Sequence, residues 1–218
     1  MSRKIKVTQK ELKSPDKFRE AVSNTILFLS DNYKKILLVI FVVITIAVIT
    51  FVLINRLEKR DLEANSEFSE ASKIYSDGNS QEALSKFLAV REKYPDTRIS
   101  TIALYYAGSI NYELGNYDQS ISQLNDFMNS DLDDQTLKDA AYLTLGLSSF
   151  NLGKWQEAID YLSHLNQDGG PYANQARLHI GMSLEKLGRS DEAEEIYKQI
   201  LNEQTANNPG LRVNQPNQ

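Results

Sequence analysis

One short phrase recurs four times between residues 64 and 207, and it constrains the fold more than any other feature of the chain. Each copy has a Gly, a small residue seven positions before it, and another small residue five positions after it. The glycines are 37, 38 and 35 residues apart, and both small-residue positions keep these spacings. The three registers are Gly78, Gly115, Gly153 and Gly188 for the glycines; Ala71, Gly108, Gly146 and Gly181 before them; and Ala83, Ser120, Ala158 and Ala193 after them. Three registers that agree across four copies indicate an internal repeat.

Each copy predicts a pair of helices joined by a tight turn. A Gly is favoured where a helix ends, because it adopts positive φ angles without steric cost. Acidic residues follow each turn, where the N-terminus of a helix favours negative charge: Glu82, Asp118, Glu157 and Glu192. Small residues on both helices allow close packing, and larger side chains are expected to fill the space between neighbouring pairs: Phe87, Leu124, Leu162 and Tyr197. Trp155, the only Trp, is expected to be a packing anchor. Because a single pair cannot bury its apolar face, the four pairs are predicted to stack.

The pattern resembles the tetratricopeptide repeat (TPR), whose signature runs Trp-x2-Leu-Gly-x2-Tyr, then Ala-x3-Phe, then Pro. The matching residues are Ala71, Ala83, Phe87 and Pro95 in the first copy; Leu104, Gly108, Ser120 and Leu124 in the second; Tyr142, Leu145, Gly146, Ala158 and Leu162 in the third; and Gly181, Ala193 and Tyr197 in the fourth. Only the first copy keeps the final Pro. The resemblance implies an all-α fold, with a TPR domain over residues 64–207 and repeats near 64–97, 101–134, 139–172 and 174–207.

An uninterrupted apolar run precedes the repeats. Residues 36–54 read ILLVIFVVITIAVITFVLI, with no charge, Gly or Pro. As a helix they span about 28 Å, which is close to the hydrocarbon thickness of a bilayer. Cationic residues flank the run and can extend to the two interfaces: Lys34, Lys35, Arg56, Lys59 and Arg60. We interpret the run as an uncleaved signal anchor, since a buried core helix is seldom so long and apolar, and no small-residue cleavage site follows Ile54.

The charge distribution predicts the orientation of this anchor. Residues 1–35 contain nine Lys or Arg and four Asp or Glu, whereas residues 55–218 contain fifteen and twenty-five. The twenty residues on each side of the run contain four Lys or Arg each, so these flanks alone favour neither orientation. The nine Lys or Arg of the whole N-terminal tail favour an orientation with the N-terminus in the cytoplasm. The acidic body then lies outside the inner (plasma) membrane, which is the periplasm if the host is Gram-negative. Its negative charge also repels phosphate backbones, so we expect no binding to nucleic acids.

Three shorter segments complete the predicted organisation. In the basic tail, residues 1–35, Ser14 and Pro15 suit the start of a short helix in which Phe18, Val22, Ile26 and Leu29 recur at helical spacing. This helix either lies on the anionic inner leaflet or extends the membrane helix. Residues 55–63 are expected to form a helical connector, because no Gly or Pro occurs between Asp16 and Asp77. Residues 208–218 are polar, rich in Asn, Gln and Pro, and predicted to be disordered.

The sequence contains no recognisable catalytic or metal-binding motif. It has no Cys, Walker loop, Gly-x-Ser-x-Gly or His-Glu-x-x-His. The two histidines, His164 and His179, lack partners at a metal-ligand spacing and are expected to have solvated or packing roles. Asp131, Asp133 and Asp134 resemble half of a calcium loop without its Gly and Glu, so we expect a polar loop that caps the next helix. We therefore predict a protein that is not an enzyme and has no cofactor.

The predicted interaction site is the concave surface of the solenoid. In TPR proteins the first helix of each pair lines this surface, at the second, fifth, ninth and twelfth positions of the repeat. Nine aromatic or aliphatic residues at these positions are the candidate binding residues: Phe68, Tyr75, Tyr105, Tyr112, Leu143, Leu147, Phe150, Leu178 and Met182. The set lacks the Lys, Arg and Asn residues with which some TPR domains bind a C-terminal carboxylate. An apolar, Tyr-rich groove suits an extended or helical peptide with exposed hydrophobic side chains. Alternatively, an adjacent helix, the tail or a second copy of the protein covers part of it.

The order of a basic tail, one signal anchor and an acidic TPR body resembles a bacterial family. This is the family of YfgM-like ancillary subunits of the SecYEG translocon, whose TPR domain is grouped with that of the cell division coordinator CpoB. The resemblance implies a periplasm-facing adaptor that binds translocon subunits, exported polypeptides or chaperones. Two alternatives stay open: a scaffold for envelope assembly or division, and a self-associating structural module. The sequence leaves the oligomeric state open.

Overall fold

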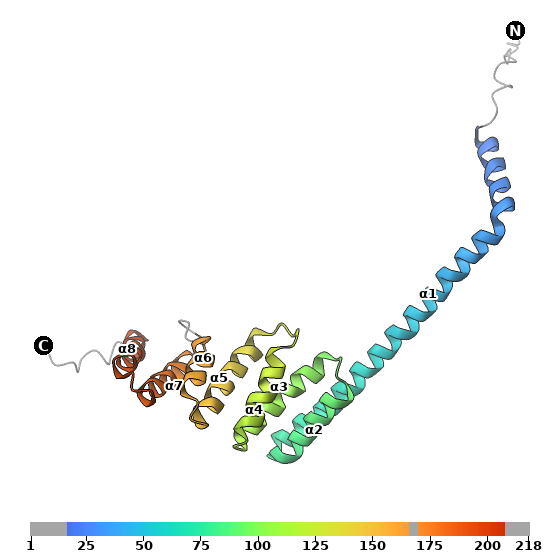
Figure 1. Ribbon diagram of the computed structural model, residues 1–218. Helices are drawn as coiled ribbons and strands as arrows, with labels where there is room; N and C mark the ends of the chain where they lie inside the picture. The colour runs from blue at the N-terminus through green and yellow to red at the C-terminus, as the bar shows by residue number, and fades with distance from the viewer. Residues whose placement is uncertain (1–16, 166–169, 208–218) are drawn as a thin grey trace, which may run out of the picture. The chain divides into compact units, whose positions relative to one another are not determined.

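The computed structural model describes residues 17–165 and 170–207, and every secondary-structure element in these ranges is an α-helix (Figure 1). The helices are α1 (Lys17–Ser76), α2 (Ser80–Lys93), α3 (Arg98–Glu113), α4 (Tyr117–Met128), α5 (Gln135–Asn151), α6 (Trp155–Ser163), α7 (Ala173–Lys186) and α8 (Ser190–Asn207). The chain divides into two compact units, Met1–Glu58 and Lys59–Gln218. The predicted helix start at Ser14 and Pro15 and the predicted disordered tail lie outside the described residues. Over the described part of the chain the all-α prediction is confirmed.

In the first unit, α1 carries the apolar run of residues 36–54. The helix is long and apolar enough to cross a membrane. Its most apolar stretch is not buried against any other described part of the chain. Thr45 and Thr50 donate hydrogen bonds to the carbonyls of Phe41 and Ile46, one turn earlier, so their hydroxyl groups are satisfied within the helix. No break interrupts α1 at the boundaries between the predicted tail helix, membrane helix and connector. This continuity agrees with the absence of Gly and Pro from the segment.

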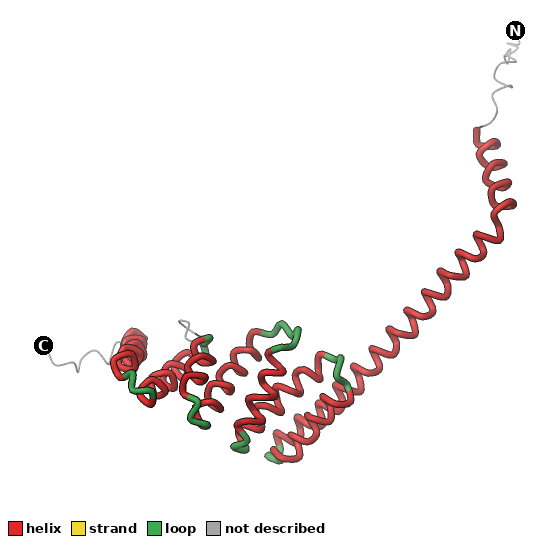
Figure 2. Tube along the Cα trace, in the orientation of Figure 1, coloured by secondary structure: helices red, strands yellow, loops and turns green. Residues whose placement is uncertain are grey.

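The second unit is a stack of helical pairs (Figure 2). The C-terminal part of α1 packs on α2 through a shared core, and the following pairs are α3 with α4, α5 with α6, and α7 with α8. Each helix from α2 to α7 also packs against the helix that follows it. The first helices of neighbouring pairs touch as well, α3 with α5 and α5 with α7. These three helices therefore form a continuous layer, as expected for a TPR-like solenoid.

The four turns within the pairs share one backbone conformation. Their glycines have φ angles between 74° and 88°, which few residues other than Gly adopt. In the first turn, the N–H of Gly78 donates to the Tyr75 carbonyl, and the N–H of Asn79 donates to the Ile74 carbonyl. The other three turns repeat both hydrogen bonds. This is the Schellman arrangement, which satisfies carbonyls at the end of the first helix and starts the second.

The earlier glycines of the repeat let the two helices of a pair approach closely. A Cβ atom at Gly108 would lie 2.6 Å from Leu124 Cγ, well inside van der Waals contact. Equivalent atoms at Gly146 and Gly181 would overlap the second helices of their pairs in the same way. Leu124 is fully buried and also belongs to the core cluster that contains Leu145 of α5. One large side chain therefore fills the contact within its own pair and the space toward the next pair.

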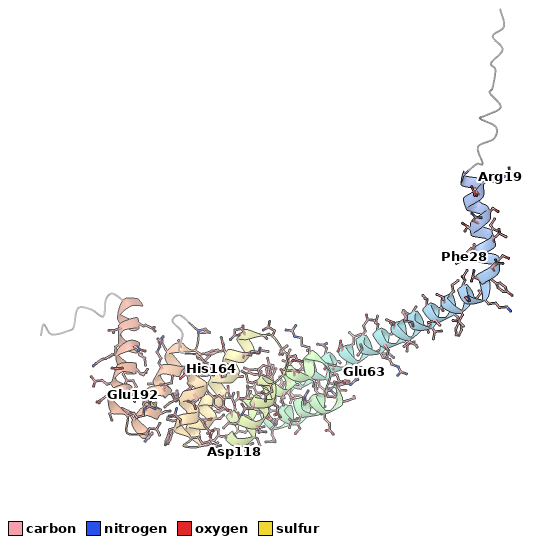
Figure 3. The ribbon with its side chains drawn as sticks, turned by 45° about the horizontal axis from the view of Figure 1, so that its top comes forward. Arg19, Phe28, Glu63, Asp118, His164 and Glu192 are labelled. Atoms are coloured by element: carbon pink, nitrogen blue, oxygen red, sulfur yellow. The ribbon has the colours of Figure 1, made fainter. Side chains whose placement is uncertain are left out.

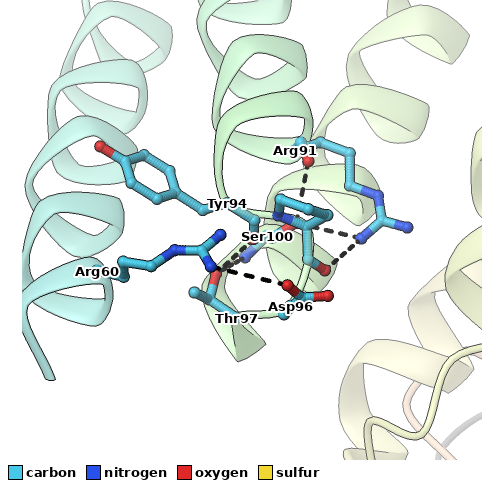
Figure 4. Close-up of polar contacts among 7 residues, drawn as sticks. Arg60, Arg91, Tyr94, Asp96, Thr97 and Ser100 are labelled. Atoms are coloured by element: carbon cyan, nitrogen blue, oxygen red, sulfur yellow. Dashed lines mark hydrogen bonds and ion pairs between the residues drawn. The ribbon is translucent and has the colours of Figure 1, made fainter. Parts of the chain in front are cut away.

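Polar side chains hold the connection between α2 and α3 (Figure 4). The Thr97 hydroxyl accepts a hydrogen bond from the Ser100 N–H at 3.2 Å and caps α3. Arg91 Nη1 donates to the Pro95 carbonyl at 3.0 Å and to the Ser100 hydroxyl at 3.2 Å. The connection with the one final Pro of the TPR signature is thus fixed by side chains from both flanking helices.

The second helix of the fourth pair, α8, differs at one repeat position from the second helices of the earlier pairs, α2, α4 and α6. The residue after the buried small position is apolar in the three earlier helices and packs in their cores: Leu84, Ile121 and Ile159. In α8 this residue is Glu194, which is exposed and lies 2.6 Å from the Lys198 ammonium group. A charged pair is well solvated in water and costly to bury against an apolar partner. This face of α8 therefore suits solvent rather than another stacked pair.

Replacing Gly108 by Ala is expected to destabilise the second unit. Ala favours helix formation by up to about 1 kcal/mol, but its methyl group would displace Leu124, and such overpacking costs about 1–3 kcal/mol. Urea unfolding of a fragment of residues 59–218 measures the change. Ser109→Ala, one residue along the same helix, is the control and should have little effect. Unchanged or increased stability of Gly108→Ala would contradict the close approach of α3 and α4.

Replacing Glu194 and Lys198 together by Leu should make the same fragment self-associate. The change restores an apolar face of the kind that the earlier second helices bury against the next pair. Sedimentation velocity should show a monomeric parent fragment and larger species for the variant. The matched control, Glu195→Leu with Gln199→Leu, adds the same side chains one position along α8. If both variants associate equally, added hydrophobicity rather than this register is the cause.

Candidate protein-binding surface

The nine candidate binding residues all lie on the first helices of the four pairs. Phe68 and Tyr75 lie on α1; Tyr105 and Tyr112 on α3; Leu143, Leu147 and Phe150 on α5; and Leu178 and Met182 on α7. We refer to the face formed by these positions as the first-helix surface. The nine side chains differ in burial, and this decides which of them a partner can reach.

Three of the nine candidates belong to the packed interior. Leu143 and Leu147 are only 9% and 7% exposed and lie in the core between α5 and α7. The Phe68 ring is partly buried, with its centroid 5.3 Å from that of Phe87 and 5.5 Å from that of Tyr106. These side chains support the first-helix surface from beneath and leave a partner little area to contact.

Three of the remaining candidates form a regular line, which we refer to as the aromatic row. Tyr75, Tyr112 and Phe150 occupy the same position in the first three repeats, and all three are partly exposed. Residues from the following helices back the second and third rings. Tyr112 lies 5.8 Å from Tyr117, and Phe150 lies 5.0 Å from Trp155, between ring centroids. Such pairing stabilises the orientation of the rings, and it gives Trp155 the anchoring role that the sequence predicts.

The tyrosines on the first-helix surface are neutral. Burial raises the pKa of Tyr105 and that of Tyr112 above the ordinary value of about 10. Burial and a hydrogen bond to Glu113 raise the pKa of Tyr75. The Tyr75 hydroxyl donates this hydrogen bond from α1 to α3, across the boundary between the first two pairs. All three hydroxyl groups therefore remain protonated at physiological pH.

Two carboxylates lie beside the aromatic row. Glu113 is exposed and accepts the hydrogen bond from Tyr75. Glu185 is exposed and takes the place of an aromatic residue at the same position in the fourth repeat. One negative charge thus lies on α3 beside Tyr75 and Tyr112, and the other lies on α7, beyond Phe150 of α5. This arrangement can bind hydrophobic side chains and attract nearby Lys or Arg residues of a partner.

His179 extends the aromatic row onto α7 through a packing contact, which is one of the two roles that the sequence predicts for it. Its ring lies 5.1 Å from the Phe150 ring in an edge-to-face arrangement. Burial lowers the pKa of His179, and its buried Nδ1 atom has no hydrogen-bond partner among the described residues. The residue was missed because it lies one position beyond the expected binding position, Leu178, whose side chain is 46% exposed. By contrast, His164 is exposed, and its ring stacks on that of Tyr142 with the centroids 4.1 Å apart.

A large cleft lies away from the aromatic row. It measures about 710 Å³ and is lined by the connections from α2 to α3 and from α4 to α5. Arg91, Arg98, Asp126 and Asp131 place both signs of charge along its wall.

Asp134, nearby in the sequence, accepts a hydrogen bond from the Leu137 N–H at 3.2 Å and caps α5, as predicted for this polar loop. In the described ranges, no group of three His, Cys, Asp or Glu side chains could hold a metal ion.

Residues 49–213 match the model of the protein family described as "T7SS, ESX-1 secretion system protein EccA1, N-terminal domain". The match begins inside the apolar run and covers all four repeats. Among curated proteins, no significant match is found.

Solved structures of MamA have a similar fold. "MamA 41-end from Desulfovibrio magneticus RS-1" is 17% identical, with a TM-score of 0.57 over 69% of this chain and 80% of that chain. "MamA RS-1 ArsTM double mutant" is 18% identical, with a TM-score of 0.58 over 71% and 81%. "Crystal structure of MamA protein" is 21% identical, with a TM-score of 0.57 over 66% and 76%. The likeness shows a TPR-like helical fold and does not single out the YfgM-like or CpoB group.

Acidification is expected to destabilise the second unit through His179. Because burial lowers its folded-state pKa below the unfolded value of about 6.5, the unfolded chain binds more protons as the pH falls. The contribution of neutral His179 is therefore complete above the unfolded pKa and declines as the pH falls toward the folded pKa. His179→Gln should reduce the loss of unfolding free energy between about pH 7 and about pH 5.5. His164→Gln is the exposed control, and the prediction fails if all three proteins show the same pH dependence.

Proposed function

Because the chain belongs to the family described as "T7SS, ESX-1 secretion system protein EccA1, N-terminal domain", we propose that it is a membrane-anchored TPR adaptor. It binds protein partners on the first-helix surface. The aromatic row is the observation that carries this proposal, since stacked repeats expose three aromatic side chains at one position in successive pairs. Structural packing alone would favour their complete burial, as it does for Leu143 and Leu147.

The partner is a polypeptide that presents hydrophobic side chains in an extended or helical segment. Tyr112 and Phe150 offer rigid ring surfaces that bind apolar groups at a low entropic cost. Glu113 and Glu185 favour a segment that carries Lys or Arg near its apolar side chains. The neutral hydroxyl of Tyr112 can also donate a hydrogen bond to a backbone carbonyl of the partner.

The apolar run of α1 supplies the anchor in this proposal. The nine Lys and Arg residues of the N-terminal tail favour a cytoplasmic N-terminus. The second unit then lies on the extracytoplasmic side of the inner membrane. Its net negative charge does not oppose this topology, because long domains cross the membrane largely regardless of their charge.

We assign the adaptor to the Sec translocon, where it meets exported polypeptides or recruits their chaperones. The matching family bears the name of a secretion-system protein, which supports a role beside protein export. The layout that resembles the YfgM-like subunits supports the same assignment. A scaffold for envelope assembly or division is the alternative, and the identity of the bound partner separates the two.

A photo-crosslinking amino acid at Tyr112 of the full-length protein in living cells tests the proposal. We expect it to capture translocon subunits, chaperones or newly exported chains, which mass spectrometry identifies. Division or cell-wall proteins would support the alternative scaffold. The same crosslinker at Leu88, which is 37% exposed on α2 and outside the first-helix surface, is the matched control.

Side-chain replacement tests the aromatic row itself. With the crosslinker at Met182, Tyr112→Ala combined with Phe150→Ala should weaken binding, and with it capture, about thirtyfold, because truncation of buried aromatic contacts costs about 2 kcal/mol or more. Circular dichroism of the fragment must show that the double variant remains folded. Unchanged capture by a folded double variant would remove the aromatic row from the binding site.

A further inference from the structure

We propose that residues 17–33 of α1 lie in the membrane–water interface as an amphipathic helix on anionic lipid headgroups. The inference rests on the proposed membrane span at residues 36–54 and goes beyond it. It assigns a lipid-binding surface to a segment that is outside both the span and the repeats.

The segment has one apolar face. Val22, Ile26, Leu29 and Tyr33 follow one another at intervals of four, three and four residues, which places them along one side of a helix. Glu20, Asn24 and Asp31 recur on the opposite side. Leu27 and Phe28 depart from the pattern, because both lie toward the polar side. The segment is therefore amphipathic, unlike the apolar run that follows it, which is hydrophobic all round.

No described residue of the first unit covers the apolar face. Val22, Ile26, Leu29 and Tyr33 are 41%, 60%, 48% and 53% exposed. The membrane-spanning residues begin at Ile36, three residues after Tyr33. Three helical residues advance the chain by about 4.5 Å, so the face ends next to the bilayer. The adjacent lipid interface is therefore the apolar surface within reach of these side chains.

A bend separates this segment from the span. The ribbon of α1 changes direction beyond Phe28 (Figure 3). Here Asn32 Nδ2 donates a hydrogen bond to the Phe28 carbonyl at 3.0 Å, in competition with the backbone of the helix. Side-chain donors that enter the backbone ladder bend helices. The bend allows the amphipathic segment to follow the membrane surface while the apolar run crosses the bilayer.

Positive charge and an aromatic ring mark the junction. Lys34 and Lys35 lie directly before the apolar run, and the Lys34 ammonium group is 5.9 Å from the centroid of the Tyr33 ring. Lys residues at this depth attract anionic lipid headgroups, and Tyr favours the interface because its ring is apolar and its hydroxyl is polar. Arg19 adds a cation near the start of the segment.

The absence of cysteine from the chain permits a direct test, since any single Cys variant carries a unique label. Full-length Ile26→Cys and Asn24→Cys, reconstituted in vesicles of phosphatidylcholine and phosphatidylglycerol, place labels on opposite faces of the segment, only two residues apart along the chain. We expect a membrane-impermeant maleimide added to the side that holds the N-terminus to modify Asn24→Cys roughly tenfold faster than Ile26→Cys, because only the apolar face enters the lipid. Replacing the phosphatidylglycerol with phosphatidylcholine should reduce the difference.

Two results would overturn the interfacial position. Equal, fast modification of both variants means that the segment projects into water, and equal, slow modification means that it continues the span. Val43→Cys, in the middle of the apolar run, separates these failures from failure of the anchor. If Val43→Cys resists modification, the span stands whatever the segment does. If it reacts freely, the span and the inference that depends on it both fail.

Discussion

The close contact between the two helices of each pair determines the geometry of the second unit. Gly108, Gly146 and Gly181 have no side chain to keep the second helix away. A Leu side chain or a Tyr ring of the second helix therefore reaches the backbone of the first helix. Close packing then leaves little freedom in how each pair is held. Equivalent positions recur at the same place on each pair, and the first helices α3, α5 and α7 form one layer. The aromatic row is regular because these contacts are regular.

The repeat phrase was enough to predict the helix pairs, because it encodes local rules. The positive φ of Gly78 and its three counterparts, the acidic first turns and the small packing positions all follow from backbone sterics and helix capping. The hydrophobic run predicted a membrane span but not the limits of a helix. Hydrophobicity changes at residues 36 and 54, whereas backbone hydrogen bonding continues through both in α1. The ends of the apolar run are therefore not the ends of the helix.

The burial of the candidate binding residues could not be predicted from the repeat phrase in the way that the helix pairs could. Leu143 and Leu147 occupy the repeat positions of Tyr105 and Ser109, yet the two leucines are in the core and the earlier two residues are partly exposed. The repeat position fixes the direction of a side chain, but its exposure depends on the residues of the next pair. For α5 these are apolar residues of α7, including Ile180 and Leu184. The contact of His179 with Phe150 arises in the same way, since it joins two pairs.

The polar contacts between pairs also have a consequence for how the chain reaches its folded state. Tyr75 and Glu113 are 38 residues apart, and Asn125 and Tyr161 are 36 apart. Each of these bonds connects only adjacent pairs, so no pair depends on a distant part of the chain. Chains with such local contacts fold rapidly and can do so progressively from one end. In the proposed topology, a chain that enters the membrane through α1 would fold its repeats in order as they emerge on the far side, with only the newest pair exposed at any moment.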